Sequence, residues 1–228
     1  MEKEKMSTNF FLNTQLTALI EKGFSCIESH PCHHLESGIR EAIYLALGAH
    51  HDPIAHKRRR LLAQQAINKV APLWYTTWPQ DTLLMPLLDR FIRYKERRVV
   101  EKNEFLYTQL DEDWERMSAF ADNTWIQDPL HRKHRFAESM VGLTVVLATE
   151  LVLFDSFVTS EESFLPQKDE EIDLMENELH FYAAFAYAGG PPFPMHYFGT
   201  GSPEKYKDYW TWWLQEALPY AWKEGMNK

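Results

Sequence analysis

Apolar residues recur every three or four positions along most of this chain, and that spacing marks one face of an α-helix. The clearest stretch is 54–79, where the pattern persists for more than three turns. Asp52 and Pro53 in front of it form a helix start, because aspartate caps a helix and proline fits its first position. Pro72 lies late in the stretch and is expected to kink or tighten the last turns, since it has no N–H group to donate.

Seven further helices are predicted from the same spacing. They are expected within residues 9–29, 35–47, 82–92, 102–125, 131–157, 170–188 and 203–217. Thr8 or Asn9 can cap the first of them. Ser202 and Pro203 open the last one, and Pro219 is expected to end or kink it.

The apolar run Met140–Phe154 carries β-branched residues and could be mistaken for a pair of strands, but it lacks turn residues and alternation, so we expect a helix. A helix of that composition is buried in a protein core. We therefore predict an all-α fold of about eight helices packed around this central apolar helix. The chain is expected to form a single domain over residues 1–228, with residues 1–7 as a flexible tail.

Composition and charge narrow the classes of function. The net charge of −9 argues against general binding of nucleic acid, which needs cations for the phosphates, and it suits a basic protein partner. Cys26 and Cys32 are too few for a disulfide scaffold or a cysteine-only zinc site, so we expect buried or half-buried free thiols. The N-terminus has no apolar signal segment, and Met140–Phe154 is judged too short and too polar to span a bilayer. We expect a cytosolic protein that does not bind a membrane.

Two histidine clusters are the main candidates for metal chemistry. The first comprises His30, Cys32, His33 and His34, and the second comprises His50, His51, Asp52 and His56. Metal ligands must converge on one point, whereas the adjacent His33 and His34 would point apart and Pro53 separates His51 from His56. The second cluster is similar to the His-Asp pairs of all-helical metal phosphohydrolases, but further ligands on other helices cannot be placed. We therefore expect solvated loop histidines, no bound metal and no cofactor.

Charged residues on the apolar helices give no enzyme signature. Glu150 could serve as a buried acid or base, although a carboxylate there more often pairs with arginine or lies at a polar edge. Arg59, on or beside the apolar stripe of 54–79, is expected to reach a carboxylate on a neighbouring helix. The basic run Lys57–Arg60 could form a nucleic-acid patch, but the net acidity and the missing helix-turn-helix pattern oppose this. The nucleophile motif Gly-x-Ser-x-Gly is absent, so we do not expect an enzyme.

An acidic segment is the strongest signal for a partner. Its carboxylates are Glu161, Glu162, Asp169, Glu170, Glu171, Asp173, Glu176 and Glu178, against Lys168 as its one basic residue. Such a field speeds association with a basic partner, and Phe164 in its middle could anchor the same partner. The predicted partner-binding residues are Glu161, Glu162, Phe164, Asp169, Glu170, Glu171, Asp173 and Glu176. The alternative interpretation is a solvated loop and helix face.

Two segments carry a family resemblance. They read RRRLLAQQAINKVAPLWYTTWP at residues 58–79 and YWTWWLQEALPYAW at residues 209–222. With them the chain resembles the bacterial immunity proteins of polymorphic toxin systems, in the class numbered five. The resemblance implies a largely helical cytosolic protein that neutralises a cognate toxin domain by binding it, and it brings no catalytic residues. An all-α metal-dependent hydrolase that uses the loop histidines, or a helical scaffold or regulator, remains the alternative.

Overall fold

The fold is built from α-helices throughout the part of the chain that the structure describes. This computed structural model describes residues 12–80, 82–95, 103–127, 132–155, 178–193 and 200–226. The helices are α1 (Thr14–Ser29), α2 (Ser37–Ala46), α3 (Pro53–Thr77), α4 (Leu84–Tyr94), α5 (Glu104–Gln127), α6 (Arg132–Phe154), α8 (Leu179–Ala188), α9 (Pro203–Trp212), the π-helical turn η2 (Trp213–Ala217) and α10 (Leu218–Met226). No strand occurs within these ranges, which confirms the predicted fold class. Because α9, η2 and α10 form one continuous rod, the described helices number eight.

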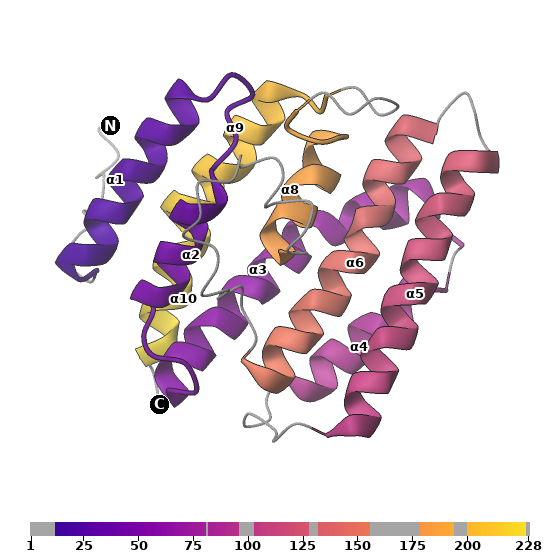
Figure 1. Cartoon of the computed structure of the whole chain (residues 1–228), viewed down its shortest axis with the longest axis horizontal. Coiled ribbons are helices and arrows are strands. Elements are labelled where there is room, and N and C mark those ends of the chain that lie inside the picture. Colours follow the sequence, from indigo (N-terminus) through magenta and orange to yellow (C-terminus); the bar gives the residue numbers. More distant parts are fainter. Residues whose placement is uncertain are drawn as a thin grey trace, which may run out of the picture.

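Helix α6 is the centre of the fold, as predicted for the apolar run. It packs against α3, α4, α5 and α8, and Figure 1 shows it between α8 and α5. Its side chains are buried along nearly the whole length, including the hydroxyl residues Thr144 and Thr149. These hydroxyls donate to the carbonyl oxygens four residues earlier, at 2.9 and 2.8 Å, so the polar groups in the core are satisfied within the helix.

The judgement that this apolar stretch is too short and too polar for a membrane was wrong. Over Arg135–Phe154 the helix is long and apolar enough, by length and composition, to cross a bilayer. However, 78% of its most apolar window is buried inside the protein. Its packing against four neighbouring helices is therefore what marks it as a core helix.

Helix α3 links the two sides of the molecule. It contacts α6 on one side and α10 and η2 on the other, and it also contacts α8. In Figure 1, the N-terminal helices α1 and α2 lie beside the C-terminal rod of α9 and α10, while α4, α5 and α6 lie on the opposite side. Buried apolar side chains from all the described helices form one core cluster. The division of the chain into domains stays a prediction.

Local sequence signals set most of the helix starts. Asp52 Oδ1 accepts from Ala55 N at 2.8 Å with Pro53 at the first position, which confirms the predicted start of α3. Ser202 caps α9 in the same way. The start of the first helix was predicted wrongly: α1 begins at Thr14 with Asn13 as its cap, because Asn13 Oδ1 accepts from Leu16 N at 2.7 Å.

Pro72 and Pro219 occur inside helices without ending them. Pro72 lies within α3, which continues to Thr77. Pro219 lies within α10, directly after the π-helical turn Trp213–Ala217. That turn adds a residue to one turn of the rod, and such a bulge is a usual way to accommodate a residue that cannot donate its N–H. The last helix therefore extends to Met226 instead of ending at Pro219.

Candidate functional site

The predicted acidic binding segment falls outside the described residues. Glu161, Glu162, Phe164, Asp169, Glu170, Glu171, Asp173 and Glu176 all lie within 156–177, so their role as a binding surface stays a prediction. Glu178 is described, and it is not part of a solvated face. Its carboxylate caps α8 by accepting from His180 N at 2.8 Å and Phe181 N at 2.7 Å, and it lies 3.1 Å from Arg40 Nε. Glu178 is therefore a structural residue that joins α8 to α2.

The histidines of the two predicted clusters differ in burial, and His30 and His33 are half-buried. His50 and His51 are exposed, as expected for loop histidines. That expectation was wrong for His34 and His56, which are buried. His56 Nε2 lies 3.1 Å from the carbonyl oxygen of Val152, and burial lowers the pKa of its imidazole. Both cysteines are free thiols, with Cys26 buried and Cys32 half-buried, as predicted.

His34 belongs to a buried polar cluster between α2, α8 and α9. Trp210 Nε1 lies 3.2 Å from its Nδ1, and Arg40 Nη1 lies 3.1 Å from its Nε2. A neutral imidazole has one acceptor nitrogen, so His34 accepts from one of these two donors in each tautomer. Trp210 of α9, His34 and Arg40 are all buried, so none of the three side chains faces solvent. The cluster fixes the loop before α2 against α9.

The three residues His50, His51 and Asp155 lie together within the described part of the chain. Their potential ligand atoms are all within 4.8 Å of one another. However, the Asp155 carboxylate already accepts from Arg59 Nε and Nη2 at 2.7 and 2.6 Å and from His51 N at 2.7 Å. A divalent cation at this point would have to lie beside the guanidinium charge. The donor set therefore does not fit a metal site, and the structure does not place His56 in it.

The Arg59–Asp155 pair confirms the expectation that Arg59 reaches a carboxylate on another helix. Both side chains are fully buried. Arg59 Nη1 also donates to Gly48 O at 2.9 Å, so the pair joins α3, the α2–α3 turn and the end of α6. The expected acidic candidate, Glu150, is only half-buried. Asp155 was missed by sequence reasoning, although an aspartate directly after the most apolar run of the chain was a signal for it.

The basic run at the start of α3 is used inside the fold. Arg58 is buried, stacks on the ring of Trp222 at 3.4 Å and donates to Leu47 O at 2.9 Å. Arg59 pairs with Asp155, and Arg60 donates to the carbonyl oxygen of Lys95. A nucleic-acid patch needs cations on the surface, so these three arginines do not form one.

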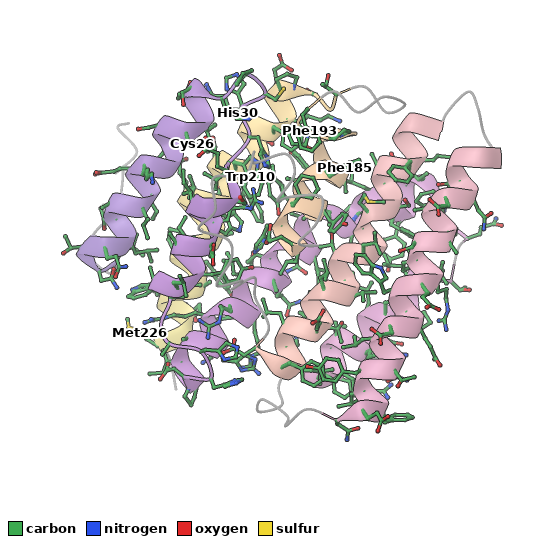
Figure 2. All side chains as sticks on the ribbon, in the orientation of Figure 1. Cys26, His30, Phe185, Phe193, Trp210 and Met226 are labelled. Carbon is green, nitrogen blue, oxygen red and sulfur yellow. The ribbon has the colours of Figure 1, made fainter. Side chains whose placement is uncertain are left out.

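A groove with largely apolar walls lies between α5, α6 and α8. Its volume is about 200 Å³. Its lining residues are Trp114, Ser118, Ala121 and Asp122 from α5, Phe136, Met140 and Leu143 from α6, and Phe181, Tyr182 and Phe185 from α8. Phe185 lies between α8 and α6 (Figure 2), 6.1 Å from the ring of Phe136. The small side chains of Ser118 and Ala121 face these large rings, so α5 does not fill the space.

The approach of α5 to α6 below this groove depends on a glycine. A Cβ atom at Gly142 would lie 2.0 Å from Met117 Cε, so Met117 can occupy its position only because residue 142 has no side chain. Met117 is fully buried, and the helix turn that follows it carries Ser118 and Ala121 into the groove wall. The groove therefore lies beside a closely packed contact of α5 with α6 and is not a gap between loosely placed helices.

Comparison with known families identifies the family of this chain. A family model described as immunity protein Imm5 matches residues 20–220. The chain belongs to the Imm5 family. This confirms the resemblance drawn from residues 58–79 and 209–222, and membership makes the chain a toxin immunity protein. No curated protein matches it.

In this Imm5 protein, the two segments that carried the resemblance pack against each other. Helix α3 contacts α10, and Arg58 of the first segment stacks on Trp222 of the second. Gly225 allows this contact, because a Cβ atom there would lie 2.3 Å from Arg58 Cγ. Arg58 and Trp222, which join the two segments, therefore serve folding.

Proposed function

We propose that this Imm5 protein is a cytosolic inhibitor that neutralises a cognate bacterial toxin domain by binding it. Membership of the immunity protein family is the observation that carries this proposal. The net charge of −9 supports a basic toxin domain as the partner, since opposite charges speed encounter. We propose binding and not catalysis as the mode of action, because the polar side chains of the His34 and Arg59–Asp155 clusters are buried and are used to join helices.

Stoichiometry is the experiment that separates an inhibitor from an enzyme that inactivates the toxin. The toxin domain encoded beside this gene would be titrated with the purified Imm5 protein while toxin activity is measured. A binding inhibitor should abolish activity at one equivalent and form a stable complex on gel filtration. Full inactivation at a small fraction of one equivalent, without a complex, would refute the proposal. Co-expression of the two proteins, with growth as the readout, tests protection in cells.

The acidic segment is proposed to steer the toxin towards the inhibitor. Reversal of Glu170, Glu171 and Asp173 to lysine should slow association, most strongly at low salt, because exposed charges are screened beyond about 8–10 Å at physiological ionic strength. The Phe164→Ala variant should instead speed dissociation, at a cost of roughly 1–3 kcal/mol if Phe164 is an anchor.

A matched control makes the same change in net charge at positions outside this segment. Reversal of Glu21, Asp89 and Glu216, which are exposed on α1, α4 and η2, serves this purpose. If both triple variants associate at the same rate and with the same salt dependence, the acidic segment is a solvated face and not a binding surface.

A further inference from the structure

We propose that the groove between α5, α6 and α8 receives one apolar side chain of the toxin domain, presented beside a lysine or arginine. This inference rests on the proposed function and adds to it the chemistry of the partner. The groove walls are aromatic and aliphatic, and Trp114, Phe136 and Tyr182 stay half-buried at its mouth. An apolar side chain that enters the groove would cover these exposed ring surfaces and so gain free energy from burial.

The size of the groove selects a side chain over a small molecule. Sites for cofactors and metabolites enclose about 300–1,000 Å³. The groove holds about 200 Å³, which suits one large apolar residue. Protein interfaces concentrate their binding energy in such places, where an aromatic or aliphatic anchor fills a pocket near the centre of the contact.

The charge next to the groove selects a basic neighbour for that anchor. Asp111, Glu115 and Asp122 are exposed on α5 and spaced by four and seven residues, so they form one stripe along the helix. Ser118, at the same face, belongs to the groove wall, and so does Asp122. The stripe therefore runs directly along one edge of the groove.

The basic residue of α5 does not lie on this stripe. Arg116, the one basic residue of that helix, lies about a third of a turn round the helix and 3.6 Å from Asp113. A cation on the toxin should accordingly lie over α5, about one helical turn from the anchor that enters the groove.

Filling the groove from within tests the proposal. In Ser118→Trp the indole occupies the groove, whereas in Ala119→Trp the same indole is added at an exposed position of the same helix that does not line the groove. Affinity for the toxin domain encoded beside this gene would be measured by interferometry, with circular dichroism to verify folding. We expect Ser118→Trp to bind at least 30-fold more weakly than wild type, the effect of losing a hot spot, and Ala119→Trp to stay within threefold.

A charge reversal provides a second variant that does not depend on core packing. Glu115→Lys with Asp122→Lys should slow association at low salt more than Glu21→Lys with Glu216→Lys, which changes the net charge equally on distant helices. Equal association rates for the two double variants would refute the claim that a basic residue of the toxin lies over α5. Wild-type affinity in folded Ser118→Trp would refute the claim that the groove receives a toxin side chain, while the proposed inhibitor function would stand. A wild-type protein that neither binds nor protects would overturn the proposed function and this inference together.

Discussion

The buried Arg59–Asp155 pair offers the sharpest test of the fold. We predict that Asp155→Asn destabilises the protein strongly, because it leaves the guanidinium of Arg59 buried without a counter-charge. Asparagine is nearly the same size as aspartate and tolerates the left-handed backbone of this position, where φ is 53°. The substitution therefore removes the charge and replaces one of the two accepting oxygens by a donor, with little change in size.

The expected magnitude is set by burial. Both side chains are fully inaccessible, and the contacts are two charge-assisted hydrogen bonds of 2.7 and 2.6 Å. Removing one partner of such a pair costs about 3–5 kcal/mol, a large part of the total stability of a domain. At this chain length, that cost lowers the melting temperature by roughly 6–20 °C.

An exposed ion pair of similar length is the matched control. Lys207 Nζ lies 2.7 Å from Glu28 Oε1, but both side chains are well exposed. Lys207→Met should leave the melting temperature nearly unchanged, because water and salt screen an exposed pair. Thermal and urea unfolding of both variants would be followed by circular dichroism, at 0.1 and 1 M salt. An Asp155→Asn protein that melts within about 2 °C of wild type would refute the claim that the pair contributes strongly to stability.

Three further predictions concern the protonation of His180, two glycine substitutions and the removal of metal ions. Burial holds the pKa of His180 well below its usual 6.5, so below about pH 6.5 the unfolded chain binds a proton that the folded chain does not. The free energy of unfolding should therefore fall as pH decreases from about 6.5, by at most about 1.4 kcal/mol per pH unit for this group. When it is measured by urea unfolding at several pH values, the free energy of unfolding of His180→Asn should depend less steeply on pH than that of wild type. Gly38→Ala should stabilise the protein by up to about 1 kcal/mol, because the new methyl group has open space around it. Gly201→Ala should cost about 1–3 kcal/mol, because its Cβ would lie 2.4 Å from a backbone oxygen. Changes in melting temperature of the same sign for the two variants would contradict this prediction. EDTA should leave the melting temperature unchanged, and a decrease that disappears in His50→Ala or His51→Ala would instead establish a metal site.

The sequence alone predicted the helices well because the signals that specify them are local. An apolar residue every three or four positions requires only a few turns of chain, and the caps Asp52 and Ser202 act within three residues. The central place of α6 was also predictable, since a helix that is apolar on all sides must be buried on all sides. The family resemblance was correct because it rested on contiguous segments.

Tertiary structure decided which polar residues are buried and where the surface is hollow. Arg59 was expected to meet a carboxylate, but Asp155 is 96 residues away in sequence and only the packing of α3 on α6 selects it over Glu150. His34 was expected to be a solvated loop residue, but α9 covers it with Trp210. A pattern along one helix reveals which face is buried but not its partner, because partners are chosen by contacts between distant segments.

The groove between α5, α6 and α8 had no counterpart in the sequence analysis for the same reason. Ser118 and Ala121 are ordinary helix residues, and they become a groove wall only where the rings of α6 and α8 stand opposite them. The depth of such a hollow depends on the distance between helix axes, which is set here by the close contact of Gly142 with Met117. Local spacing determines the helices, whereas the space left between three helices is a property of their joint packing.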